Sequence, residues 1–127
     1  MQALFAVAAG GMVGAVLRHL VNVAAMKVVG PGFPVGTMIV NITGSFAMGV
    51  LVAAMALSWN VGQEMRLFLV VGLLGSFTTF STFSLDVYTL FERGAYGLLI
   101  LYAFGSFGLS LLGLVLGLAI VRRVFVI

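Results

Sequence analysis

Four long apolar stretches, separated by short polar breaks, occupy almost the whole chain. They cover residues 3–26, 36–58, 65–91 and 96–121 of the 127 residues. Each is at least as long as the ~20 residues that a helix needs to cross ~30 Å of hydrocarbon. Because 63% of the residues are hydrophobic and only 7% are charged, the sequence predicts an all-α membrane protein with a single four-span domain.

The breaks between these stretches contain residues that end helices. Residues 30–34 read Gly-Pro-Gly-Phe-Pro, and proline cannot donate the backbone hydrogen bond that would continue a helix. Residues 58–64 hold an interfacial tryptophan, Trp59, and residues 92–94 form a short turn flanked by aromatic residues. Since all three loops are short, consecutive helices are expected to run antiparallel.

The basic residues give almost no instruction about orientation in the membrane. One side is predicted to carry Arg66, Arg122 and Arg123, and the other Lys27, Arg93 and the nearby Arg18. The positive-inside rule depends on a difference between such counts, and here there is none. The sequence therefore predicts insertion in both orientations, with an antiparallel homodimer as the product. The alternative is that one orientation prevails through weaker cues.

Residues 75–84 form the most unusual stretch, because serine and threonine hydroxyls alternate there with three phenylalanines. A polar group without a partner in hydrocarbon costs several kcal/mol, roughly 2–7 by transfer measurements. These hydroxyls must therefore either bond back to the carbonyl four residues earlier in their own helix or line a polar path. The second possibility makes this stretch the first candidate for function.

Two further sets of polar residues recur at helical spacing. Their members are Tyr102, Ser106 and Ser110 in the fourth span, and Thr37, Asn41 and Ser45 in the second. Residues four apart lie on one face of a helix, so each set forms a polar stripe. Hydroxyls, amides and the electropositive edges of aromatic rings can all face an anion, whereas cation pathways usually carry carboxylate rings. The pattern favours a path for a small anion.

Three segments together resemble the Fluc (CrcB) family of fluoride channels, or fluoride exporters. They are residues 11–18, residues 36–46, and residues 72–84 with the run Thr-Thr-Phe-Ser-Thr-Phe-Ser. The similarity covers nearly the whole chain. It implies an antiparallel, dual-topology homodimer in a bacterial inner membrane, with a broken third helix and two pores. Through these pores, fluoride that entered the cell as the neutral acid would leave it passively.

The resemblance also implies roles for particular residues. Phe80 and Phe83 match the phenylalanines that line the pore, and Asn41 matches the pore asparagine. Tyr102, Ser106 and Ser110 match a polar track on the last helix. Thr37 is a further candidate for the path through its place in the stripe with Asn41. The carbonyls of Gly75 and Thr78 match those that hold a sodium ion at the dimer interface, and Arg18 matches a vestibule arginine.

Asp86 stands where the family more often has glutamate, and a partial ion pair between Arg18 and Asp86 is a hypothesis. Two other classes of protein fit parts of the sequence. A small dual-topology, proton-coupled multidrug exporter would need a carboxylate within the membrane, and Asp86 lies near a helix end. An accessory membrane subunit would need only glycines for packing. An enzyme is disfavoured because the chain has one histidine, no cysteine and three carboxylates.

Overall fold

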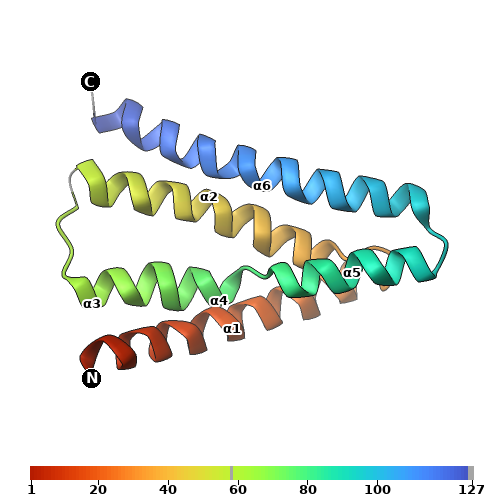
Figure 1. Cartoon of the computed structure of the whole chain (residues 1–127), viewed down its shortest axis with the longest axis horizontal. Helices are drawn as coiled ribbons and strands as arrows, with labels where there is room; N and C mark the ends of the chain where they lie inside the picture. The colour runs from red at the N-terminus through yellow and green to blue at the C-terminus, as the bar shows by residue number, and fades with distance from the viewer. Residues whose placement is uncertain (58, 126–127) are drawn as a thin grey trace.

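A computed structural model describes residues 1–57 and 59–125, and these form four long rods (Figure 1). The first two are α1 (Gln2–Val29) and α2 (Val35–Leu57), and the last is α6 (Tyr96–Phe125). The third rod consists of α3 (Gln63–Arg66), η1 (Leu67–Leu74), α4 (Gly75–Phe77) and α5 (Phe80–Glu92). All four rods are long and apolar enough to cross a membrane, so the predicted four spans are confirmed. Residue 58, the predicted end of the second span, lies outside the described residues.

The third rod is irregular in two places. Thr78 and Thr79 have extended backbone, with φ/ψ of −83°/159° and −155°/120°, and they interrupt the helix between α4 and α5. The predicted break in the third helix is therefore present. The segment η1 is a π-helix, whose turns are wider than those of an α-helix and which occurs often at functional sites. The apolar sequence of η1 gave no sign of this.

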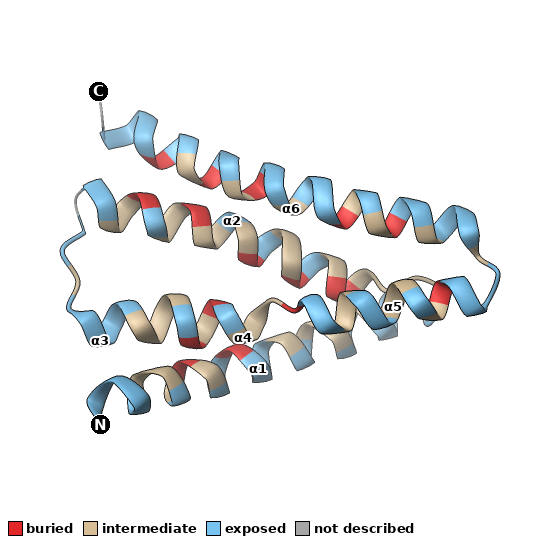
Figure 2. Cartoon of the chain, in the orientation of Figure 1, coloured by how far each residue is buried: buried red, intermediate tan, exposed pale blue. Residues whose placement is uncertain are grey.

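Glycines allow the rods to pack backbone against backbone. A side chain at Gly10 or Gly14 of α1 would overlap backbone atoms of η1 and α4, and one at Gly49 of α2 would overlap the Leu114 carbonyl of α6. Gly117 of α6 approaches the backbone of α2 in the same way. Figure 2 shows the buried positions of α6 on the side that faces α2. These glycines therefore pack helices within one chain.

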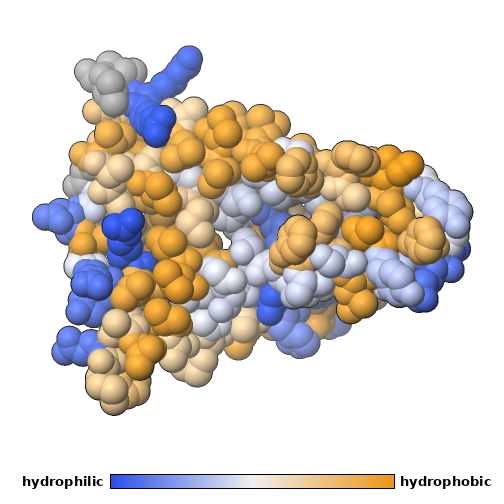
Figure 3. All heavy atoms as spheres, viewed as in Figure 1, coloured by the Kyte–Doolittle hydropathy of each residue, from blue (hydrophilic) through white to orange (hydrophobic). Residues whose placement is uncertain are grey.

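Most of the remaining surface is apolar, as expected for a protein surrounded by lipid. Figure 3 shows hydrophilic residues gathered towards the two ends, with apolar residues over much of the length between them. The start of α1 and the end of α6 lie at one end of the rods, and the loop between α5 and α6 lies at the other (Figure 1). The charged residues thus fall where the headgroups of a membrane would be.

Candidate functional site

The break in the third rod is held by a side chain from the second. The Asn41 amide nitrogen donates to the Thr79 carbonyl at 3.0 Å, and the Thr79 N–H donates to the Asn41 side-chain oxygen at 2.8 Å. Both backbone groups of one extended residue are thus satisfied by one amide. Irregular backbone at membrane depth requires such partners, because no water is available to supply them.

Thr79 also begins α5, a role that the sequence analysis missed. Its hydroxyl accepts from the Thr82 N–H at 3.2 Å and so caps the helix. Threonine is a preferred residue at this position, and the Thr-x-x-Thr spacing was the available signal. Thr79 is 8% exposed, so its hydroxyl acts within the protein.

The hydroxyls of residues 75–84 serve the helices more than they line a path. Thr78 donates to the Leu74 carbonyl at 2.9 Å and Ser84 to the Phe80 carbonyl at 3.0 Å, each within its own segment. Thr79 contacts the hydroxyls of Thr82 and Ser81 at 3.1 and 3.3 Å. Bonding back to the backbone, or capping α5, therefore accounts for much of the polarity of this stretch.

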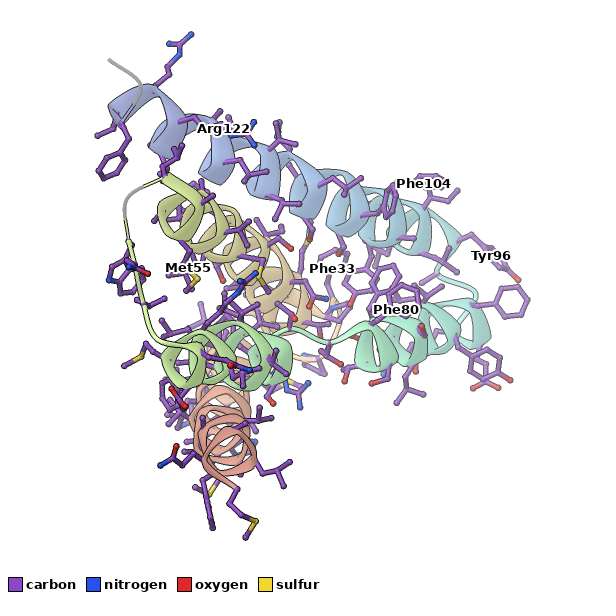
Figure 4. The ribbon with its side chains drawn as sticks, turned by 60° about the vertical axis from the view of Figure 1, so that its left-hand side comes forward. Phe33, Met55, Phe80, Tyr96, Phe104 and Arg122 are labelled. Atoms are coloured by element: carbon purple, nitrogen blue, oxygen red, sulfur yellow. The ribbon has the colours of Figure 1, made fainter. Side chains whose placement is uncertain are left out.

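A cavity of about 270 Å³ lies beside the break, between α2, the third rod and α6. It is lined by Asn41, Ser45, Thr78, Thr79, Phe80, Phe83, Ser106, Phe107, Ser110, Leu111 and Leu114. Five of the seven residues expected to line a pore share this one space. Figure 4 shows Phe80 at the start of α5, on the side that faces α6.

Two hydroxyls in this cavity have no partner. The side-chain oxygens of Ser106 and Ser110 are buried and accept or donate no hydrogen bond among the described residues. Neither hydroxyl bonds back to the carbonyl four residues earlier in its own helix. The Asn41 amide retains one N–H beyond the one given to Thr79. The cavity thus offers three uncommitted donors, from α2 and α6.

Tyr102 and Thr37 lie just beyond this cavity. Tyr102 is fully buried, its ring packs 5.4 Å from that of Phe83, and its hydroxyl donates to Asp86 at 2.8 Å. Thr37 is 4% exposed and lies beside the Tyr102 hydroxyl. The partner of Asp86 is thus Tyr102, so the hypothesis of a pair with Arg18 is not supported.

The remaining predicted residues lie outside the cavity lining. Arg18 is half-buried on α1, away from the residues that enclose the cavity. Gly75 lies in α4, where its carbonyl would ordinarily accept the N–H of Thr79. That N–H is given to Asn41 instead, so the helix break frees the Gly75 carbonyl from its usual helical partner.

Comparison with known proteins extends these observations. Residues 5–118 match the family described as CrcB-like protein, Camphor Resistance (CrcB). A relative from Agrobacterium fabrum, named Fluoride-specific ion channel FluC, is 53% identical over 119 residues, or 94% of this chain and 95% of the relative. Relatives of the same name from Cereibacter sphaeroides and Phenylobacterium zucineum are 54% identical over 121 residues and 50% identical over 126. These two matches cover 95% and 98% of this chain, and 95% and 99% of the relatives' own chains.

Four helices that can span a membrane, three of which line a small cavity with some polar groups, define a multi-pass membrane protein. The chain belongs to the CrcB family, which the sequence analysis had identified by resemblance. This is a family of ion channels and not of enzymes, and its members lie in the bacterial plasma membrane.

Proposed function

We propose that the protein is a passive, fluoride-selective ion channel that lets fluoride leave the cytoplasm. The observation that carries the proposal is the pair of buried, unpartnered hydroxyls of Ser106 and Ser110 in the cavity beside the helix break. A buried donor without a partner is costly, roughly 1–3 kcal/mol, unless something binds it. The name Fluoride-specific ion channel FluC, borne by the relatives, supports fluoride as the ion.

The cavity's chemistry suits a small anion. Ser106, Ser110 and the remaining N–H of Asn41 are donors, and hydrogen bonds to a charged acceptor are about twice as strong as those between neutral groups. The ring edges of Phe80 and Phe83, whose centroids lie 5.6 Å apart, add weak positive potential. Among the described residues, no lysine, aspartate or glutamate lines the cavity, so a passing anion meets neutral groups that can release it.

The two serines provide a direct test. Replacing both Ser106 and Ser110 by alanine is expected to lower fluoride efflux from liposomes by ~10-fold or more, because two donors to a charged ion are lost. Folding should be retained, since neither hydroxyl bonds to another described group. Once the membrane potential has been dissipated, fluoride efflux is followed with a fluoride electrode.

Ser84→Ala is the matched control. Ser84 is exposed, and its hydroxyl bonds to the Phe80 carbonyl within α5, outside the cavity lining. The control should conduct fluoride like the unaltered protein. Equal efflux from the double alanine variant and the control would contradict the assignment of these hydroxyls to the path.

The proposal includes an antiparallel homodimer with two pores. A single chain leaves the cavity open, because Phe80 and Phe107 line it while being 78% and 64% exposed. Phenylalanine tolerates exposure to lipid, but a path for a hydrated anion does not, since charge in hydrocarbon is costly. A second copy that covers this side would close the path, with lipid surrounding the assembly.

Dual topology has its own test. Two reporters, each active on only one side of the membrane and each fused to the C-terminus, should both be clearly positive, each at about half of its full signal. The same fusions on a variant with two added lysines in the loop between α5 and α6 should shift to one side. A one-sided signal from the unaltered chain would contradict dual topology.

A sodium ion at the dimer interface completes the proposal. The Gly75 carbonyl, released by the break, and the Thr78 carbonyl beside it would hold the ion together with the same groups of the partner. Neutral oxygen donors of this kind suit a hard cation. When bound, the ion would supply positive charge that keeps the two broken helices together. Its presence is testable by sodium-dependent thermal stability of the purified protein.

A further inference from the structure

A second cavity, of about 210 Å³, lies at the end of the protein where the loop between α1 and α2 meets α5. Its walls come from the end of α1, from residues 31–34 of the loop, and from the last two turns of α5. Its lining includes one aromatic ring, Phe33, and two charged side chains, Asp86 and Arg93. None of the residues that line the first cavity lines this one.

A row of four aromatic rings connects the two cavities. Phe80 and Phe83 line the first cavity, and the Phe83 ring centroid lies 5.4 Å from that of Tyr102. Tyr102 in turn lies 5.6 Å from Phe33 of the second cavity, in an edge-to-face arrangement at 89°. Figure 4 labels Phe33 and Phe80, the rings at the two ends of this row.

Tyr102 forms the partition between the cavities. It is fully buried, lines neither cavity, and contacts a wall of each through its ring. Its hydroxyl proton is committed to Asp86, which also lines the second cavity. Along this row Phe33 and Tyr102 meet edge to face, and the other two neighbouring pairs of rings are tilted at 34° and 39°. The edges of such rings carry partial positive charge and can face an anion.

The two charged side chains of the second cavity differ in their hydrogen-bond partners. The Asp86 carboxylate accepts the hydrogen bond of Tyr102 and is half-buried. Arg93 is exposed, and its guanidinium donates to the neutral Pro31 carbonyl at 3.3 Å. A bond to a carbonyl leaves the positive charge of Arg93 in place, and it occupies one of five N–H donors. The rim of the cavity therefore holds a fixed cation with free donors.

We propose that the second cavity is a vestibule of the anion path, in which Arg93 concentrates the anion and Phe33 is the outermost ring that it meets. The proposal rests on the proposed function, since it extends the same path towards the loops. The ligand is a small, hard, monovalent anion. A fixed charge at a narrow mouth raises the local concentration of its counter-ion, and salt weakens the effect.

Substitutions at Arg93 test the role of charge. Arg93→Gln should lower fluoride efflux from liposomes at least ~3-fold at low ionic strength, and the difference should vanish in concentrated inert salt. Arg93→Lys should retain most of the flux, because it keeps the charge. Lys27→Gln is the matched control, since Lys27 lies at the same end of the protein, in the last turn of α1, and lines neither cavity.

Several outcomes would overturn the proposal. Equal efflux from Arg93→Gln and Lys27→Gln at low ionic strength would remove Arg93 from the path. A deficit that persists at high salt, or that Arg93→Lys shares, would assign Arg93 to holding the loop through Pro31. If the unaltered protein carries no fluoride, the proposed function itself fails; flux in the unaltered protein without an effect at Arg93 refutes this inference alone.

The role of the Phe33 ring has a separate test. Phe33→Leu should lower fluoride efflux several-fold at all salt concentrations, because an aliphatic side chain has no positive edge. Phe91→Leu is the control, since Phe91 is exposed at the same end and pairs with Tyr96, at 5.8 Å, outside both cavities. Equal efflux from the two leucine variants would overturn the role of Phe33. The Arg93 series decides the vestibule independently of how well Phe33→Leu folds.

Discussion

Replacing Asn41 by leucine is expected to abolish fluoride conduction and to destabilise the protein by ~2–6 kcal/mol. Leucine has nearly the shape of asparagine but can satisfy neither backbone group of Thr79, which Asn41 now bonds at 2.8 and 3.0 Å. Each unsatisfied buried group costs roughly 1–3 kcal/mol. Thermal unfolding in detergent measures the stability, and fluoride efflux from liposomes measures the conduction.

Thr43→Val is the matched control for this substitution. Thr43 lies two residues further along α2, is exposed, and bonds only to the Ile39 carbonyl of its own helix. The change from polar to apolar is similar, but the break is untouched, so stability should change by less than ~0.5 kcal/mol. If Asn41→Leu were as stable and as active as Thr43→Val, the role of Asn41 at the break would be refuted.

Gly49→Val is the substitution with the second large expected effect. A Cβ at Gly49 already meets the Leu114 carbonyl and the Leu118 nitrogen of α6, and valine adds two methyl groups. Inserting atoms into a packed interface typically costs about 1–3 kcal/mol, and overlap with rigid backbone is at the upper end. Since α2 and α6 both line the first cavity, fluoride efflux should fall together with thermal stability.

Gly108→Val controls for the loss of a helix glycine. Gly108 is an exposed residue of α6, and a Cβ built there meets nothing within 4 Å. Valine is the better helix former of the two residues, by a few tenths of a kcal/mol. The control should therefore be at least as stable as the unaltered protein. A Gly49→Val variant with an unchanged midpoint of thermal unfolding would show that α2 and α6 are less closely packed than described.

The four spans were predictable because they depend on composition over ~20 residues, which sequence records directly. The stripe of Tyr102, Ser106 and Ser110 was predictable for a similar reason, since spacing along one helix fixes which residues share a face. Sequence could not decide whether each hydroxyl bonds to its own helix. Ser84 does so and Ser106 does not, although both lie in apolar helices, because only neighbouring segments determine what each side chain meets.

Features that join distant segments could not be predicted from the sequence. Asn41 and Thr79 are 38 residues apart, and nothing local to either residue predicts that one amide will satisfy the other's backbone. The π-helix η1 has the sequence of an ordinary apolar helix. The backbone of Gly10 and Gly14 of α1 approaches η1 closely, and only tertiary packing creates that contact.

The most direct test of the central claim is the efflux of fluoride from liposomes that contain the purified protein, with chloride efflux and proton movement followed in parallel. A channel of the proposed kind should release fluoride rapidly once a potassium ionophore dissipates the membrane potential, with little chloride and no obligatory proton exchange. The same preparation should be monodisperse before reconstitution, which establishes that it is folded. The absence of fluoride efflux from such protein, or fluoride movement strictly coupled to protons, would contradict the account.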